Sequence, residues 1–340
     1  MGDMSANGRS ANVLVAGGAG YIGSHTCKAL AAAGFVPVTY DNLVRGHLPA
    51  VRWGPFEHGD ILDSQRLAEV VSKYRPRTII HFAAYAYIEE SVCHPGWYYR
   101  NNVSGSLALI IAALRHGVSN IIYSSSCAVF GIPSKVPVTE DAPKAPISPY
   151  GMTKLIVEQM LSDFHQARQL NWMALRYFNA AGADPDREIG ELHSPEPHII
   201  PRLFKGADEG QPFTIAGTDY DTPDGTCIRD YVHVSDLAEA HVKALSALEA
   251  GAESGPFNLG AGKGYSVREV IETVRRVTGM DVPFDAGPRR PGDPPVLVSD
   301  ATRARDLLGW EPTASDIDHI VRTAWDWFKS VKERGNIAVP

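Results

Sequence analysis

The stretch Asn12-Val-Leu-Val-Ala16-Gly17-Gly-Ala-Gly20-Tyr-Ile-Gly23 decides the fold of this chain. Asn12 and the four apolar residues that follow it predict a short buried strand, and the pattern from Tyr21 to Ala33 predicts a helix. Gly17 permits the tight turn between them, Gly20 lets the backbone approach a pyrophosphate, and Gly23 lets the helix pack closely on the strand. Because a helix N-terminus offers free N–H groups to phosphates, the stretch predicts a dinucleotide-binding loop.

Strand and helix signals alternate through the first half of the chain. Strands separated by helices pair in parallel through right-handed crossovers. The pattern therefore predicts an α/β fold, a doubly wound parallel Rossmann-type sheet over residues 12–179 that also receives about 230–260. The predicted strands are 35–40, 56–60, 78–82, 120–124 and 172–177, and the predicted helices are 64–73, 95–116 and 150–169.

The composition and periodicity of the chain change after residue 179. Residues 180–230 are rich in Gly, Pro and Asp with weak periodicity, which indicates loops over a site. We expect a smaller C-terminal α/β lobe over 180–229 and 261–335, facing the carboxyl edge of the sheet, and a disordered lead-in over 1–11. Helices are expected at 234–250, 266–278 and 313–329, with a strand at 256–259.

Composition excludes several classes of function. The net charge of −7 disfavours nucleic acid or an anionic membrane as the main partner. No apolar run reaches the roughly 18 residues of a membrane span, and the N-terminus lacks the order of a signal peptide. The four cysteines form no Cys-x-x-Cys pair, which indicates a reduced, cytoplasmic protein. The histidines show no metal-ligand spacing, so we expect no metal and interpret His193 and His198 as a surface pair.

Two carboxylates at strand ends point to the cofactor. Asp41 ends the second predicted strand, 18 residues past Gly23. A carboxylate there accepts hydrogen bonds from a ribose diol and repels a 2′-phosphate, which predicts NAD rather than NADP. Arg45 is the one nearby residue that argues the other way. Asp60 follows the third strand, where it either binds the adenine amino group or caps its own loop.

Tyr150 and Lys154 stand four residues apart at a helix start, so both lie on one face. They follow the strand that ends in Ser124-Ser-Ser126. A free tyrosine has a pKa of about 10. A neighbouring ammonium and a positive nicotinamide ring would lower that pKa, so that Tyr150 takes a proton from a substrate hydroxyl while Ser126 hydrogen-bonds the same oxygen. In the alternative interpretation, Tyr150 is a helix-start aromatic and the serines are a polar strand end.

These motifs resemble the extended short-chain dehydrogenase/reductase family, and within it the UDP-galactose 4-epimerases, from about residue 12 to residue 330. Several of the matching stretches lie outside the generic dehydrogenase core and therefore bear on substrate class. The specific stretches are 17–26, 124–131, Ser148-Pro-Tyr-Gly-Met-Thr-Lys-Leu155, Arg176-Tyr-Phe-Asn-Ala-Ala-Gly182, 224–236 and Arg289-Arg-Pro-Gly-Asp293.

The resemblance implies epimerisation at carbon 4 of a UDP-hexose. NAD stays bound through turnover, takes a hydride to give a 4-keto sugar and returns it on the other face. The family also implies a homodimer that pairs the helices near 95–116 and 150–169. Catalytic residues would be Ser126, Tyr150 and Lys154. NAD would contact Gly17, Gly20, Tyr21, Ile22, Gly23, Asp41, Asn42, Asp60, Ile61, Phe82, Ala83, Ala84, Asn101, Tyr150, Lys154 and Phe178. The UDP-sugar would contact Ser126, Tyr150, Asn179, His198, Arg229, Arg290 and Asp293.

Three positions depart from the family pattern. Ala86 stands where many members carry a lysine, so one phosphate contact is missing or supplied by another residue. His198 replaces an asparagine that some members place against the nucleotide. Leu297 replaces a large tyrosine that limits the sugar site in some members, which predicts a roomier site.

Other activities fit parts of the same pattern. A nucleotide-sugar dehydratase shares the fold and the Tyr/Lys pair, but it needs an acid pair where this chain has Cys127 and Ala128. Epimerisation of UDP-xylose and UDP-arabinose, or of UDP-N-acetylhexosamines, differs only in the sugar. A non-catalytic NAD-binding scaffold would tend to lose Tyr150 or Lys154, and both are present.

Overall fold

The computed structural model describes residues 12–290 and 292–335, so the lead-in predicted over 1–11 lies outside the described residues. A seven-stranded parallel sheet has the order β10-β6-β5-β4-β1-β2-β3. Its strand order reverses between β1 and β4, which confirms the predicted doubly wound Rossmann-type sheet. The strands are β1 (Asn12–Ala16), β2 (Val36–Asp41), β3 (Phe56–His58), β4 (Thr78–His81), β5 (Asn120–Ser126), β6 (Asn171–Tyr177) and β10 (Gly255–Leu259).

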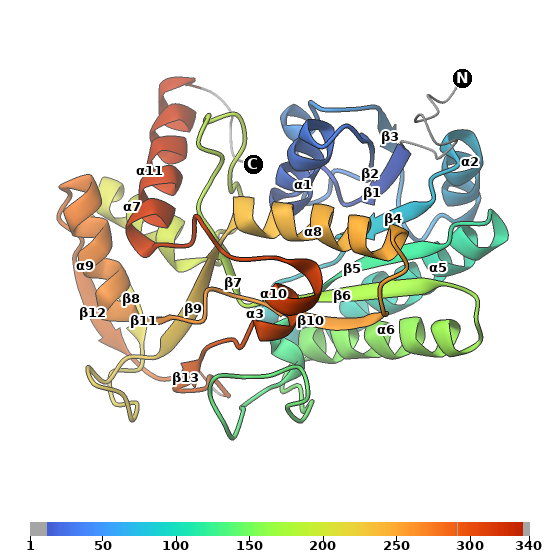
Figure 1. Ribbon diagram of the computed structural model, residues 1–340. Helices are drawn as coiled ribbons and strands as arrows, with labels where there is room; N and C mark the ends of the chain where they lie inside the picture. Colours follow the sequence, from blue (N-terminus) through green and yellow to red (C-terminus); the bar gives the residue numbers. More distant parts are fainter. Residues whose placement is uncertain (1–11, 291, 336–340) are drawn as a thin grey trace.

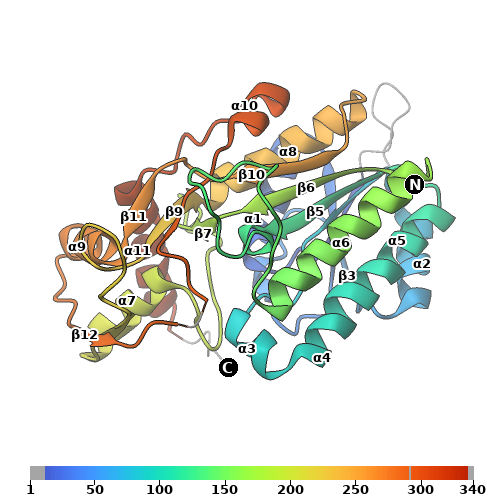
Figure 2. The ribbon, with the colours of Figure 1, turned by 90° about the horizontal axis from the view of Figure 1, so that it is seen from below.

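Helices cover both faces of this sheet (Figure 1). α1 (Tyr21–Ala32) and α8 (Val234–Glu249) pack on one face. α2 (Ser64–Tyr74), α5 (Gly105–Arg115) and α6 (Pro149–Gln166) pack on the other, which Figure 2 shows from below. Val13 and Val15 of β1 belong to the first core, and Leu14 and Ala16 belong to the second. Burial on both faces explains why this strand is an unbroken apolar run.

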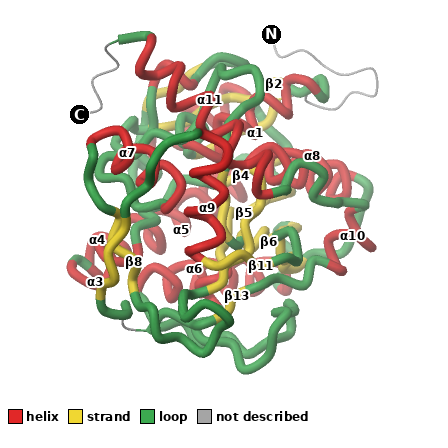
Figure 3. The backbone as a smooth tube through the Cα atoms, turned by 90° about the vertical axis from the view of Figure 1, so that its left-hand side faces the viewer, coloured by secondary structure: helices red, strands yellow, loops and turns green. Residues whose placement is uncertain are grey.

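A smaller lobe continues from the large sheet without a linker, because β9 (Ile228–His233) leads directly into α8. β7 (Asn179–Ala181) and β13 (Val296–Leu297) pair with β9 in parallel, and β11 (Gly264–Ser266) pairs with it antiparallel. β8 (Phe213–Ala216) pairs with β12 (Phe284–Gly287). Figure 3 views the molecule from the side of this lobe. Its helices are α7 (Ile199–Glu209), α9 (Val267–Thr278) and α11 (Ile317–Glu333), which share one core, and α10 (Thr302–Leu308).

One expectation about these elements is incomplete and another is wrong. The helix predicted over 95–116 is present, but it contains a π-helical turn at Tyr99–Ser104 between α4 (Pro95–Tyr98) and α5. The wide turn buries Asn102, whose side chain accepts from the Tyr85 backbone N–H and donates to its carbonyl. The loops predicted over 180–230 contain α7 and β8, because a helix with a clear apolar face is hidden there among glycines and prolines. α3 (Ile88–Cys93) was also not anticipated.

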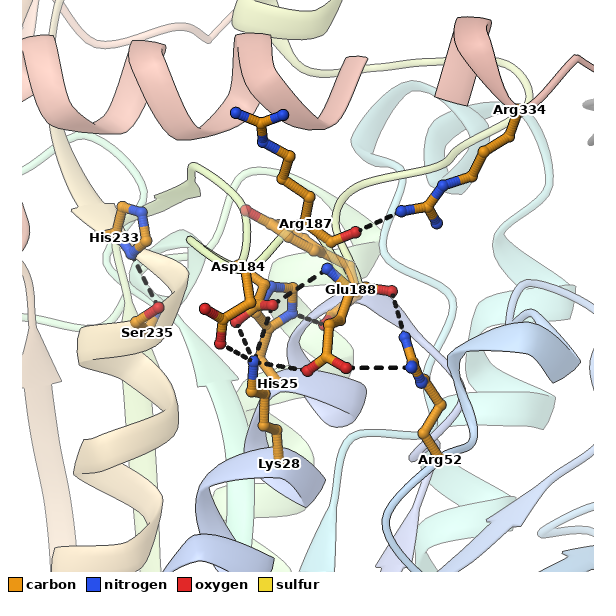
Figure 4. Close-up of polar contacts among 11 residues, drawn as sticks. His25, Lys28, Arg52, Asp184, Arg187, Glu188, His233, Ser235 and Arg334 are labelled. Atoms are coloured by element: carbon orange, nitrogen blue, oxygen red, sulfur yellow. Dashed lines mark hydrogen bonds and ion pairs between the residues drawn. The ribbon is translucent and has the colours of Figure 1, made fainter. Parts of the chain in front are cut away.

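One ionic cluster ties the smaller lobe to α1. Lys28 Nζ lies 2.8 Å from Asp184 Oδ1, 2.7 Å from Asp186 Oδ2 and 2.8 Å from Glu188 Oε2. Figure 4 shows this ammonium between carboxylates, with Arg52 reaching Glu188 from the other side. Burial opposes the charge of Lys28, but hydrogen bonds to the three carboxylates raise its pKa above the ordinary value. The cluster fixes the segment that follows β7 beside the dinucleotide loop.

Candidate active site

The predicted site residues come from the carboxyl ends of the parallel strands. Gly17 follows β1, Asp41 ends β2, Phe82 follows β4, Ser126 ends β5 and Phe178 follows β6. The carboxyl ends of parallel strands meet at one edge of a sheet, and open α/β sheets bind ligands there. The cofactor and catalytic residues predicted from sequence therefore occupy one edge.

The glycine loop has the shape that a pyrophosphate needs. Gly17 has φ +83°, and a Cβ on it would lie 2.6 Å from the Ala83 nitrogen. A Cβ on Gly23 would lie 2.2 Å from the Gly17 carbonyl oxygen, so the helix packs against the turn only with glycine there. Gly20 is the N-cap of α1 and supplies no side chain to cap it. The N–H groups of the first turn of α1 are therefore not taken by a capping side chain, and the loop fits a dinucleotide.

Asp41, the predicted ribose-binding residue, is fixed by two backbone N–H groups. Its Oδ2 accepts from the Ala19 N–H at 3.0 Å and its Oδ1 accepts from the Leu43 N–H at 2.8 Å, while burial raises its pKa. Arg45, which argued for NADP, pairs with Glu90 at 2.6 Å and lies over the Tyr87 ring at 4.6 Å. Its charge is thereby engaged, so the residues around Asp41 fit NAD better than NADP.

Asp60 already has partners in its own loop. Its Oδ1 accepts from the Leu62 N–H at 2.8 Å, and its Oδ2 accepts from Asn42 Nδ2 at 2.8 Å. This geometry is the loop-capping arrangement. Ile61, between them, is buried in the core under α2 and α5. The adenine contact of Asp60 stays a prediction.

The residues predicted to line the nicotinamide side of the site come from three places. Phe82, Ala83 and Ala84 follow β4, Phe178 follows β6, and Asn101 lies in the π-helical turn. The N–H groups of Phe82 and Ala83 both donate to the Ala16 carbonyl oxygen, at 2.7 and 2.9 Å. Ala84 follows directly. Asn101 donates from Nδ2 to Asn102 Oδ1 at 2.9 Å, and Phe178 lies in a buried apolar cluster. These contacts fix the backbone around the strand ends.

The three predicted catalytic residues lie together. Ser148 caps α6 by accepting from the Gly151 N–H at 3.2 Å, which places Tyr150 in the first turn and Lys154 one turn later. Lys154 Nζ donates to the Ser124 carbonyl oxygen at 2.6 Å and lies 5.7 Å from the centre of the Tyr150 ring. Ser126 ends β5 and interacts with the Tyr150 hydroxyl.

The direction of the Tyr150 pKa differs from the sequence expectation. Burial raises the pKa of Tyr150 to about 12, although the hydrogen bond with Ser126 acts in the opposite direction. Burial also lowers the pKa of Lys154 to about 7, with Glu158 opposing that shift. The protein alone therefore does not make the phenol acidic, because desolvation outweighs the hydrogen bond with Ser126.

Sequence reasoning missed Glu158, which lies one further turn along the same face of α6. Its Oε1 accepts from Arg176 Nε at 2.9 Å and from Ser125 Oγ at 2.5 Å, and its Oε2 accepts from Arg176 Nη2 at 2.6 Å. The side chains of Glu158 and Arg176 are only 5% and 2% exposed. The repeated spacing of four through Tyr150, Lys154 and Glu158 is the signal that could have revealed it.

A Lys154→Met substitution should give a stability difference that depends on pH. The pKa of Lys154 is about 7 in the folded protein and returns to about 10.4 in the unfolded chain. Between these values the unfolded wild type binds more protons, so its stability rises with pH. The advantage of the variant in free energy of unfolding should therefore shrink as the pH rises from about 7 to about 10. Urea unfolding of both cofactor-free proteins at several pH values measures this difference in free energy of unfolding. A difference that stays constant with pH would contradict the prediction.

The predicted substrate anchors separate into two groups. Arg229 on β9 donates from Nη2 to Asp293 Oδ1 at 2.6 Å, and Asn179 on β7 donates to the Asp230 carbonyl oxygen at 2.9 Å. Arg290 is half-exposed and its Nε lies 3.2 Å from Glu89 Oε1, at the start of α3. The structure thus pairs Arg229 with Asp293 and directs Arg290 toward the larger domain.

The expected surface pair of histidines is wrong for His193. Its side chain is 16% exposed, and its Nδ1 lies 3.0 Å from Glu191 Oε1, while His198 is half-exposed and contacts the same oxygen. Burial opposes their charges, but Glu191 and Glu196 raise the pKa of His193 to about 9 and of His198 to about 10. Sequence spacing did not show that Glu191 and Glu196 fold onto these histidines.

Comparison with known proteins identifies the family of this chain. The model of the NAD dependent epimerase/dehydratase family matches residues 13–260. The chain belongs to this family. A UDP-glucose 4-epimerase from Rhizobium meliloti (strain 1021) is 49% identical to this family member over 327 residues, which is 95% of this chain and 99% of that protein.

Solved structures of family members superpose closely on the chain. A UDP-glucose 4-epimerase from Brucella ovis in complex with NAD is 52% identical with a TM-score of 0.91, covering 93% of this chain and 98% of that one. The enzyme from Bifidobacterium longum in complex with NAD⁺ and UDP is 36% identical with a TM-score of 0.89, covering 94% and 98%. The family resemblance read from the motifs is therefore confirmed. Within the described ranges, no helix is long and apolar enough to cross a membrane.

Proposed function

We propose that this chain is an NAD-dependent epimerase that inverts carbon 4 of a UDP-hexose and interconverts UDP-glucose and UDP-galactose. The placement of Tyr150, Lys154 and Ser126 at the same sheet edge as the dinucleotide loop carries the proposal. The relatives that match over nearly the whole chain are named UDP-glucose 4-epimerases, and one was solved with NAD.

Bound NAD accepts a hydride from carbon 4 and returns it to the other face of the sugar. Tyr150 holds and moves the proton of the carbon-4 hydroxyl, and Ser126 hydrogen-bonds the same oxygen. Because burial raises the pKa of Tyr150 to about 12, the phenol keeps its proton until a positive charge lies beside it. Proton transfer is thereby confined to the enzyme that carries its oxidised cofactor. Lys154, whose Nζ lies 5.7 Å from the centre of the Tyr150 ring, would hold the nicotinamide ribose.

The smaller lobe, over 180–229 and 261–335, is proposed to hold the nucleotide part of the substrate. Arg229 is mostly buried and offers a forked donor for a diphosphate, with Asp293 fixing its plane. Asn179 on β7 and His198 at the N-cap of α7 are proposed as further contacts to the nucleotide. Arg290, half-exposed, can exchange Glu89 for a phosphate at little cost because exposed ion pairs are weak.

The decisive experiment mixes pure protein with UDP-galactose and no added nucleotide, and follows UDP-glucose by chromatography. Conversion is expected from NAD that stays bound. UDP-xylose and UDP-N-acetylglucosamine are tested separately and rank the sugar preference. Absence of any UDP-glucose, even after NAD is added, would overturn the proposal.

Leu297 is proposed to leave room for a larger sugar. It is buried in one apolar cluster with Phe178 and Cys127, the neighbour of Ser126. Leu297→Tyr should lower turnover of UDP-N-acetylglucosamine by roughly 10-fold or more and leave UDP-galactose largely unaffected. Leu297→Met, which conserves volume, is the matched control. A wild type that epimerises UDP-galactose but not UDP-N-acetylglucosamine would contradict the roomier site.

We also propose that two copies of the chain pair through the helices near 95–116 and 150–169, which are α4, the π-helical turn, α5 and α6. This surface exposes four large apolar side chains, Trp97, Tyr99, Leu107 and Ile111. Such a group of apolar side chains is uncommon on the solvent-exposed surface of a monomer. Sedimentation at working concentration tests it, and a monomer mass would overturn it. The four cysteines are free thiols, which supports a proposed place in the cytoplasm. A role in galactose metabolism is proposed from the UDP-glucose 4-epimerase relatives.

A further inference from the structure

Two histidines and two glutamates of segment 191–198 turn their ligand atoms toward one another. His193 Nδ1 lies 3.0 Å from Glu191 Oε1 and 3.5 Å from Glu196 Oε1. His198 Nδ1 lies 3.6 Å from Glu196 Oε1 and closer still to Glu191 Oε1. All four ligand atoms are within 4.8 Å of one another. Two imidazole nitrogens therefore alternate with two carboxylate oxygens around one point.

The spacing of these atoms matches the edges of a tetrahedral metal site. Zinc binds histidine nitrogen at about 2.0–2.1 Å and carboxylate oxygen at about 2.0–2.2 Å, which sets the edges of a tetrahedron at about 3.3–3.5 Å. Three of the four nitrogen–oxygen edges, at 3.0, 3.5 and 3.6 Å, lie around that range, and the fourth, from His198 Nδ1 to Glu191 Oε1, is shorter. Hydrogen bonding accounts for only part of the cluster: His198 Nδ1 hydrogen-bonds Glu191 Oε1, whereas His193 Nδ1 is buried without a hydrogen-bond partner of acceptable geometry in the described chain.

The neighbouring acidic cluster differs from segment 191–198 because a lysine already pairs with its carboxylates. Asp184, Asp186 and Glu188 also converge, but Lys28 Nζ already lies among them at 2.7–2.8 Å, as Figure 4 shows for Asp184 and Glu188. In the ion pairs of the described residues, Glu191 and Glu196 have only the two histidines as cationic partners. Segment 191–198 thus has no lysine or arginine at its centre.

The backbone that carries the four ligands is held from three sides. Trp327 on α11 donates to the Glu191 carbonyl oxygen at 3.1 Å. The His193 ring lies edge-on to Tyr21 at 6.4 Å and to Tyr87 at 5.9 Å. The ligands are therefore positioned before any ion binds, which lowers the entropic cost of assembling a site.

We propose that Glu191, His193, Glu196 and His198 form a structural binding site for a divalent ion of the Zn²⁺ class. Two carboxylates and two neutral imidazoles balance the charge of such an ion, and four protein ligands without an open position are typical of structural rather than catalytic zinc. A metal on Nδ1 would fix His198 with its proton on Nε2, as a donor toward the nucleotide. The site itself does not depend on the proposed function.

The test uses the full chain without a purification tag, freed of metals by a chelator. Calorimetric titration with Zn²⁺ should give one ion per chain, and Co²⁺ should give the strong visible absorption of a tetrahedral complex. His193→Ala and Glu196→Gln should each weaken Zn²⁺ binding by roughly 100-fold or more, because each removes one of four ligands. His94→Ala, which changes a histidine stacked on Trp97, is the control and should bind as the wild type does.

Thermal unfolding gives a second reading. Zn²⁺ should raise the unfolding temperature of the wild type and of His94→Ala, and should leave Glu196→Gln unchanged, since binding to the native state alone stabilises it. Glu196→Gln is nearly isosteric, so its Zn²⁺ binding can be measured even if His193→Ala folds poorly. Equal Zn²⁺ binding by the wild type and Glu196→Gln, or the weak spectrum of six-coordinate Co²⁺, would overturn the proposal.

Discussion

A Tyr150→Phe variant is expected to epimerise UDP-galactose with a kcat roughly 10²–10⁴-fold below that of the wild type, the range that general acid–base groups contribute. The substitution removes only the hydroxyl that holds the proton, while the ring stays beside the Lys154 ammonium. Bound NAD should remain, because the glycine loop and Asp41 are untouched. The measurement is the initial rate of UDP-glucose formation, with NAD content determined after acid release.

A matched control separates this loss from a general effect of removing a tyrosine hydroxyl. Tyr74 on α2 donates to Glu57 at 2.7 Å, away from the carboxyl edge of the sheet. Tyr74→Phe should keep the wild-type rate. If Tyr150→Phe also keeps its rate, the proton leaves through another group and the proposed mechanism is wrong.

The sheet and the dinucleotide loop could be predicted because their signals are local. β1 is buried on both faces and therefore appears as four apolar residues in a row after Asn12. Gly23 is required by its contact with Gly17 in the same turn, and Gly17 by the positive φ of that turn, so their spacing indicates the geometry. Tyr150 and Lys154 share one helix face, which a spacing of four predicts.

The rest of the site depends on contacts between residues distant in sequence. Glu158 meets Arg176 of β6, and Glu191 meets His198 only after segment 191–198 folds back on itself. The direction of the Tyr150 pKa also could not be predicted, because it is set by burial that the sequence does not reveal. Helix α7 was missed for a different reason, since Pro201 and Gly206 within it obscure its apolar face.

The Glu158→Gln variant is expected to lose about 3–5 kcal/mol of unfolding free energy, the range for breaking a buried ion pair by removing one partner. The amide keeps the shape of the side chain but leaves the Arg176 guanidinium, 2% exposed, without its counter-charge. Activity near neutral pH should also fall, because Glu158 opposes the burial that lowers the pKa of Lys154. Urea unfolding and the pH profile of kcat measure the two effects.

Two further variants distinguish a buried charge defect from the loss of any ion pair. Glu69 pairs with Arg66 at 3.3 Å on the exposed face of α2, and Glu69→Gln should cost at most about 1 kcal/mol. Combining Glu158→Leu with Arg176→Met should recover much of the stability, because it removes both buried charges instead of one. It should not recover the pH profile, since Lys154 still lacks the neighbouring carboxylate. Equal losses in Glu158→Gln and Glu69→Gln would show that the buried pair contributes no more than a surface pair.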